Sequence, residues 1–288
     1  MNHFILGMAL VMAAPAVAHA ASPAIVAAEN FYGDVASQLA GPGVAVTSIL
    51  SNPDQDPHLF EASASTARAI AGAGIVIRNG ADYDPWMDKL LAAASSSHPV
   101  DIVAAELVHA APGANPHLWY DPATMLAVAR AVSAALAQAD PAHGPAYAAR
   151  LATFEAALAP VQARIATMGR RLAGTPVTAT EPVFGYMAAA LGLHMRNERF
   201  QLAVMNGTEP AISDVAAFED DLRQHRVRLF IYNSQASDPA AVRLRGIATQ
   251  AHVPQVGVTE TEPAGVTYQA WMADTLDALD RALGKPAS

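Results

Sequence analysis

Short β-rich runs alternate with helical, alanine-rich stretches along most of the chain. Candidate strands stand at residues 24–28, 44–50, 74–79, 100–104, 176–180, 229–233 and 254–259. Between them apolar residues recur at intervals of three and four, the spacing of an amphipathic helix, in stretches such as 34–40, 65–71, 87–94, 125–137 and 214–225. This alternation predicts an α/β fold in which parallel sheets carry helices on both faces.

One segment, residues 145–172, departs from the alternation because it contains no candidate strand. Its alanine-rich composition and a plausible C-cap at Gly174 predict one long helix. Pro160 predicts a kink or a break inside that helix, because proline lacks a backbone donor and clashes with the preceding turn. We therefore expect two α/β lobes, residues 21–143 and 174–288, joined by a rigid connecting helix over residues 144–173. An ordinary surface helix is the simpler alternative.

The first twenty residues have the layout of a cleavable signal peptide. They run apolar from Phe4 to Val17 and end in the small-x-small pattern Ala18-His19-Ala20, so the mature protein would begin near Ala21. No Lys or Arg precedes the apolar run, and an uncleaved anchor or a buried helix is the alternative. No later apolar run reaches membrane-spanning length. We expect an exported protein, periplasmic if the producer is a Gram-negative bacterium.

Composition and missing motifs exclude several kinds of site and partner. The sequence contains no cysteine, which excludes disulfides, thiolate metal sites, cysteine nucleophiles and a lipid-modified N-terminal cysteine. The 17 basic and 26 acidic residues leave a net charge of -9, which repels nucleic acid at long range. A serine nucleophile elbow, a P-loop and a dinucleotide fingerprint are all missing from the sequence, so little in it suggests an enzyme.

Histidines and glutamates follow several of the candidate strands, and ligands of open α/β sheets bind beyond the carboxyl ends of strands. His58 lies in NPDQDPHLFE and His117 in GANPHLWYDP, while Glu181 and Glu260 each follow a strand directly. Taken singly, either histidine could be a hydrogen-bonded loop residue, and Glu181 before Pro182 could be a helix N-cap. Together they place one pair in each lobe, and two imidazoles with two carboxylates suit a divalent first-row metal ion.

Two longer motifs carry a resemblance to a known family. DPHLFEASASTARAIAGAGIVIRNGADYDPWMDKLL (residues 56–91) and NPHLWYDP (residues 115–122) resemble segments of the solute-binding proteins of zinc and manganese ABC transporters, the metal-binding cluster A-I family. The resemblance covers essentially the whole mature chain. It implies a monomeric, non-enzymatic periplasmic protein that captures a divalent metal ion and delivers it to an ABC transporter permease in the inner membrane. It also implies four metal ligands, His58, His117, Glu181 and Glu260.

The sequence departs from the family pattern in ways that bear on the metal. Glu181 stands where many zinc-binding members have a third histidine and manganese-type members have glutamate. The fourth position, usually aspartate, is matched by Glu260, with Glu262 as the alternative two residues on. A long His-rich loop is missing, and His109 is the single histidine of VHAAPGA. The oxygen-rich set favours Mn²⁺ or ferrous iron, whereas intrinsic affinity favours Zn²⁺, so we expect both Mn²⁺ and Zn²⁺ to bind.

Two other classes of protein remain as alternatives. A siderophore- or haem-type binding protein has the same two-lobed, helix-linked shape, but it would line its cleft with arginine and aromatic side chains for an organic ligand. A secreted metallohydrolase would need an open coordination position and a spacing such as HExxH, which the sequence does not contain. Trp119, Tyr120, Phe184 and Tyr186 are expected either to surround the metal or to pack in the core.

Overall fold

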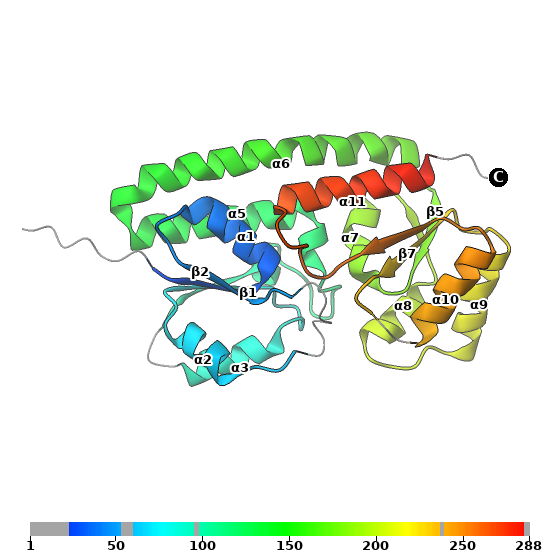
Figure 1. Ribbon diagram of the computed structural model, residues 1–288, viewed down its shortest axis with the longest axis horizontal. Helices are drawn as coiled ribbons and strands as arrows, with labels where there is room; N and C mark the ends of the chain where they lie inside the picture. Colours follow the sequence, from blue (N-terminus) through cyan, green and yellow to red (C-terminus); the bar gives the residue numbers. More distant parts are fainter. Residues whose placement is uncertain (1–22, 53–59, 95–97, 237–238, 285–288) are drawn as a thin grey trace, which may run out of the picture.

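The computed structural model describes residues 23–52, 60–94, 98–236 and 239–284. Two lobes lie side by side beneath one long helix (Figure 1). The predicted signal peptide over residues 1–20 and the predicted ligand His58 lie outside the described residues.

The N-terminal lobe is built on a four-stranded parallel sheet of order β2-β1-β3-β4. Its strands are β1 (Ile25–Glu29), β2 (Val46–Leu50), β3 (Ile75–Arg78) and β4 (Val100–Val103). Its helices are α1 (Asn30–Ala40), α2 (Ala64–Ala71), α3 (Pro85–Ala93), α4 (Ala104–Leu107) and α5 (Pro122–Ala139). Asp121 caps α5 by accepting a hydrogen bond from the amide of Ala123, as its place before Pro122 suggests.

The C-terminal lobe repeats the same arrangement with the order β6-β5-β7-β8, again all parallel. Its strands are β5 (Pro176–Ala179), β6 (His194–Arg196), β7 (Leu229–Asn233) and β8 (Gln255–Val258). Its helices are α7 (Gly185–Ala190), α8 (Glu198–Met205), α9 (Ile212–Arg223), α10 (Pro239–Gln250) and α11 (Tyr268–Leu283). The sequence did not reveal β6, because an edge strand of three residues is too short to show an alternating pattern.

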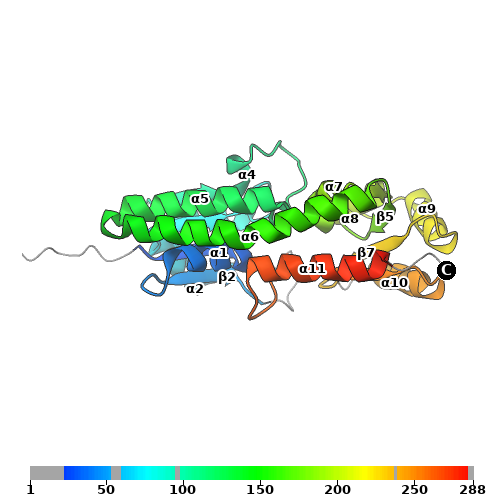
Figure 2. The ribbon, with the colours of Figure 1, turned by 90° about the horizontal axis from the view of Figure 1, so that it is seen from above.

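The long helix α6 (Gly144–Leu172) contacts α1 and α5 of the first lobe and α7 of the second, with α11 beside it (Figure 2). It runs through Pro160 as one helix, so the break that Pro160 could have caused does not occur. Leu158 and Val161, on either side of the proline, are both buried in the core. Burying two such side chains stabilises by roughly 1.5–3 kcal/mol each, which offsets the cost of about 3 kcal/mol for an interior proline.

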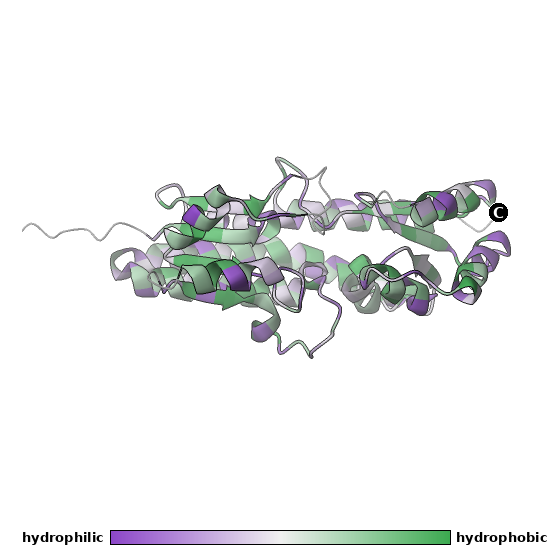
Figure 3. Ribbon diagram, turned by 90° about the horizontal axis from the view of Figure 1, so that it is seen from below, coloured by the Kyte–Doolittle hydropathy of each residue, from purple (hydrophilic) through white to green (hydrophobic). Residues whose placement is uncertain are grey.

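The largest apolar cluster extends through both lobes, and two smaller clusters among the described residues lie apart from it. Buried side chains of β1, β3 and α1 join one contiguous cluster with those of α5, α6, β5, β7, β8 and α11. Alternate residues of β1, such as Val26 and Ala28, face a separate cluster under α2 and α3. The strands visible in each lobe are accordingly coloured as apolar in Figure 3. Because the lobes share a core, a wide opening between them would expose much apolar surface.

No helix within the described ranges is both long and apolar enough to cross a membrane.

Candidate metal centre

His117 lies on the connection between α4 and α5, directly before the short 3₁₀ turn Leu118–Tyr120, and its side chain is completely buried. Its ring Nδ1 is 2.5 Å from the side-chain oxygen of Asn115. The amide of Asn115 is oriented by its own donor, because its Nδ2 lies 2.7 Å from the backbone oxygen of Pro182. A proton on Nδ1 of His117 fits this arrangement, and in the neutral ring it would leave a lone pair on Nε2.

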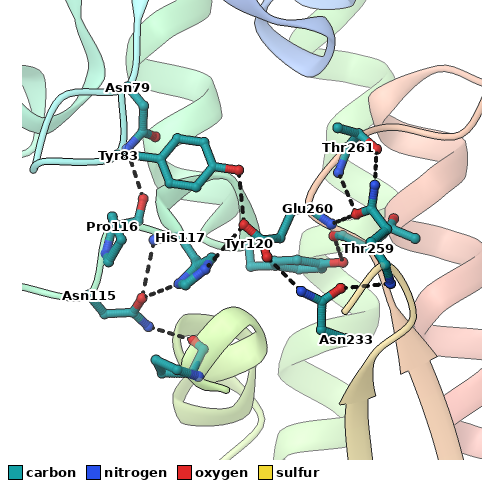
Figure 4. Close-up of polar contacts among 12 residues, drawn as sticks. Asn79, Tyr83, Asn115, Pro116, His117, Tyr120, Asn233, Thr259, Glu260 and Thr261 are labelled. Atoms are coloured by element: carbon teal, nitrogen blue, oxygen red, sulfur yellow. Dashed lines mark hydrogen bonds and ion pairs between the residues drawn. The ribbon is translucent and has the colours of Figure 1, made fainter. Parts of the chain in front are cut away.

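That lone pair points at a carboxylate from the other lobe. Nε2 of His117 is 3.6 Å from Oε2 of Glu260, and neither side chain is exposed (Figure 4). Nε2 has no hydrogen-bond partner within the described chain. With Nε2 deprotonated, this nitrogen and the carboxylate oxygen are two ligand atoms that suit a divalent metal ion.

Glu260 follows β8, and two neutral donors hold its carboxylate. Oε1 accepts from Nδ2 of Asn233 at 2.6 Å, and Oε2 accepts from the hydroxyl of Tyr83 at 3.0 Å. Burial and then the charge of Glu260 raise the pKa of Tyr83 well above its ordinary value, so the phenol stays protonated and donates. The backbone amide of Glu260 donates to Oε1 of Gln235 at 2.6 Å, which fixes the loop that carries it.

Glu262, the sequence alternative to Glu260, lies against a different part of the molecule. Its backbone amide donates to Oδ1 of Asn30, and its carbonyl accepts from Nδ2 of the same side chain, at 2.9 and 2.7 Å. Burial, followed by the charge of Asp34, raises the pKa of Glu262 to about 9. Of the two glutamates, the structure places Glu260 against His117.

Glu181 is buried and stands at the N-cap position of the 3₁₀ turn Pro182–Phe184. Its side chain makes no capping hydrogen bond, so the alternative role as an N-cap is not realised. No group of three or more His, Asp and Glu side chains that could hold a metal ion occurs within the described ranges, which do not include His58. The structure thus brings together two of the four predicted ligands, His117 and Glu260, and the set of four stays a prediction.

Sequence reasoning missed several residues that hold these two predicted ligands in place. Asn79 follows β3, and its Nδ2 donates to the carbonyl of Pro116, next to His117, at 2.8 Å. Asn233 ends β7 and binds Glu260. Both stand at strand ends, where ligands of open α/β sheets bind. The search that located the glutamates would have found these asparagines if it had included amide side chains. Tyr83 gave no such signal, because its contact with Glu260 crosses between the lobes.

Most of the aromatic side chains that we expected either around the metal or in the core belong to the core. Trp119, Tyr120 and Phe184 are fully buried, and Tyr186 is only partly buried. The Trp119 ring also lies against the His117 ring, with centroids 5.2 Å apart, so it shields one side of the imidazole from water. The histidines without a motif are all on the surface, namely His98, His143, His194, His225 and His252.

The chain matches the family described as zinc-uptake complex component A, periplasmic (ZnuA), over residues 25–282. It belongs to this family. The protein is therefore a divalent-metal-binding solute-binding protein of ABC transport and not an enzyme. Neither the siderophore- or haem-type alternative nor the metallohydrolase alternative agrees with this membership.

Individual proteins agree with the family match. A putative metal-binding protein of Treponema pallidum is 24% identical over 93% of this chain and 90% of its own length. The structure of the periplasmic zinc binding protein TroA of Treponema pallidum covers 91% of this chain and 99% of its own, at 18% identity and a TM-score of 0.77.

A manganese-bound mutant of a periplasmic metal binding protein of Candidatus Liberibacter asiaticus has a TM-score of 0.72 at 15% identity and covers 91% of this chain and 99% of its own. The two structural likenesses establish the shared fold, two β/α lobes with parallel sheets and one long helix.

Proposed function

We propose that this protein captures Mn²⁺ or Zn²⁺ in the periplasm and delivers the ion to an ABC transporter permease in the inner membrane. The proposed ligands are His58, His117, Glu181 and Glu260. The names of the two similar structures mention zinc and manganese respectively, which supports this pair of ions. The apolar run of residues 4–17 supports export to that compartment.

The observation that carries the proposal is the buried pair of His117 and Glu260. A lone pair on Nε2 and a carboxylate oxygen face each other across the lobe boundary at 3.6 Å. A divalent ion would replace the missing hydrogen bond of Nε2, and the two glutamates of the proposed set would neutralise its charge. Asn233 and Tyr83 would keep the carboxylate oriented while the ion enters.

The choice of ion follows from two opposing effects. Two carboxylates make the proposed set rich in oxygen, which suits Mn²⁺, while a fixed set of nitrogen and oxygen donors binds Zn²⁺ more tightly. We therefore expect both ions to bind, with the higher affinity for Zn²⁺. Since the lobes share one core and one long helix, we expect capture to involve only a small adjustment between them.

The test is metal analysis of the mature protein, which begins near Ala21, after dialysis against equimolar Mn²⁺ and Zn²⁺. We expect one ion per chain in the wild type, and its loss in His58→Ala and Glu260→Gln. Glu262→Gln is the matched control, because Glu262 is also a buried glutamate of the same loop but does not contact His117. Stoichiometric metal that survives Glu260→Gln would sink the assignment of this site.

A further inference from the structure

The side chain of Asn115 touches both the histidine of the first lobe and the Glu181 segment of the second. Its oxygen accepts from Nδ1 of His117 at 2.5 Å and from the backbone amide of His117 at 3.2 Å. Its nitrogen donates across the lobe boundary to the carbonyl of Pro182, the residue after Glu181, at 2.7 Å. Figure 4 shows the contacts of Asn115 with the imidazole and the backbone of His117.

The surrounding residues are shaped to admit this amide. A Cβ atom on Gly185 would lie 2.8 Å from Nδ2 of Asn115, so any larger residue there would displace it. The hydroxyl of Tyr186 donates to the backbone oxygen of Asn115 at 2.7 Å, which adds a second bond between the same two segments. From the other side, Asn79 holds the carbonyl of Pro116. The segment Asn115–His117 is therefore fixed from both lobes at once.

We propose that Asn115 is a positioning residue that sets the tautomer of His117 and couples it to the contact between the lobes. A side-chain amide has one donating and one accepting end. While Nδ2 is held by the Pro182 carbonyl, only the oxygen can face His117, so Nδ1 keeps the proton and Nε2 keeps its lone pair. Loss of the contact with Pro182 would free the amide and weaken that preference, so the imidazole is best prepared for metal when the lobes are in contact.

Only the expected effect on metal affinity rests on the proposed function. The tautomer of His117 can be measured without metal. The experiment uses nitrogen-15 NMR of histidine-labelled, metal-free protein, with the His117 signals assigned from a His117→Gln spectrum. We expect the wild type to carry its proton on Nδ1. Asn115→Ala should shift His117 towards the mixture of tautomers of an unconstrained imidazole.

Two further variants separate the roles of the amide. Asn115→Asp keeps an oxygen for Nδ1 and loses the donor to Pro182, so the Nδ1 tautomer should be restored while the bond between the lobes stays lost. Tyr186→Phe is the matched control, because it removes the neighbouring bond between the same segments without touching the amide of Asn115. It should leave the tautomer unchanged.

Metal affinity supplies the second readout. Loss of a residue that orients a metal ligand typically weakens binding by about 10- to 100-fold, which is our expectation for Asn115→Ala, and Asn115→Asp should recover most of that loss. A wild-type His117 with its proton on Nε2, or an Asn115→Ala protein with an unchanged tautomer, would overturn the inference even if metal binds. A wild type that shows the Nδ1 tautomer but binds no metal would refute the proposed function and leave the positioning role intact.

Discussion

The two lobes have the same sheet topology but present their polar strand ends in different ways. In the first, Ala27 of β1 pairs with Ile77 of β3, and two residues further on stand Glu29 and Asn79. In the second, Ala179 of β5 pairs with Ile231 of β7, and two residues further on stand Glu181 and Asn233. The same positions of the two sheets thus carry glutamate and asparagine in both lobes.

The difference lies in what these side chains contact. Asn233 binds the carboxylate of Glu260, which stands only two residues after β8. Asn79 binds backbone oxygens instead, at Gly80 and Pro116. The first lobe presents its predicted ligand, His117, from the connection that follows α4, and Asn79 therefore supports the backbone beside it rather than its side chain. The second lobe orients a carboxylate through side-chain donors, and the first holds an imidazole on a loop that hydrogen bonds fix in place.

Glu29 and Glu181, the glutamates at matching sheet positions, also differ in their surroundings. Both are buried, but neither carboxylate oxygen of Glu29 has a hydrogen-bond partner within the described residues. Burial, followed by the charge of Asp84, raises the pKa of Glu29 well above its ordinary value. Burial therefore disfavours the charged form of Glu29. The sheet position that we expect to supply a metal ligand in the second lobe thus carries, in the first, a carboxyl that favours its protonated form.

The largest expected effect is a loss of metal affinity, and it should distinguish Glu181 from Glu29. We expect Glu181→Gln to lower metal affinity by more than about 100-fold, because loss of a ligand should exceed the 10- to 100-fold effect of losing a residue that orients one. Glu29→Gln should leave metal affinity unchanged. Chelator competition on both variants measures this. Equal losses of affinity would show that the two positions do not differ in function.

The asparagines give the next effect. Asn233→Ala leaves Glu260 without one of its two donors and should weaken metal binding by about 10- to 100-fold. Asn79→Ala removes the acceptor of the buried Tyr32 hydroxyl and one of the donors to the carbonyl of Pro116, and should lower the free energy of unfolding by about 1–3 kcal/mol. Metal titration and urea unfolding of both variants separate the two outcomes. A larger loss of affinity in Asn79→Ala than in Asn233→Ala would reverse the roles.

Much of the scaffold could be predicted from the sequence, because parallel strands and covering helices leave periodic patterns. Every strand except β6 overlaps an expected run, and the long helix lies at residues 144–172, inside the expected segment. Of the two outcomes predicted at Pro160, the break does not occur, because packing of Leu158 and Val161 holds the helix together.

The site was predictable only in part, because ligands leave a chemical signal and their supports do not. His117 and Glu260 were predicted from motifs, and their side chains lie 3.6 Å apart. Asn115 was close to His117 in sequence, but its bond to Pro182 spans the lobe boundary. Tyr83 reaches Glu260 across the same boundary. Contacts of this kind depend on how the lobes sit together, and sequence spacing carries no record of that.

The smallest expected effect concerns stability against pH in the first lobe. The raised pKa of Glu29 means that the folded protein holds this proton more tightly than the unfolded chain, so its contribution is complete below the ordinary value of 4.5. Stability from this group is then lost as pH rises towards the raised pKa. Glu29→Gln removes the titrating group, and it should make the protein more stable than the wild type at pH 8, by about 1–3 kcal/mol, with no difference near pH 4.

Three neighbours titrate near Glu29 and are kept in both proteins. Burial raises the pKa of Asp84 to about 6, although bonds from two backbone amides and the charge of Arg78 oppose the rise. Tyr32 and Tyr83 have pKa values raised well above the ordinary one by burial first, with the charge of Glu29 adding to both. The two tyrosines stay protonated from pH 4 to 8, whereas Asp84 is coupled to Glu29, so urea unfolding over this range reports Glu29 together with its effect on Asp84. A stability difference that stays constant over this range would mean that Glu29 is ionised inside the lobe, and the contrast with Glu181 would then need another cause.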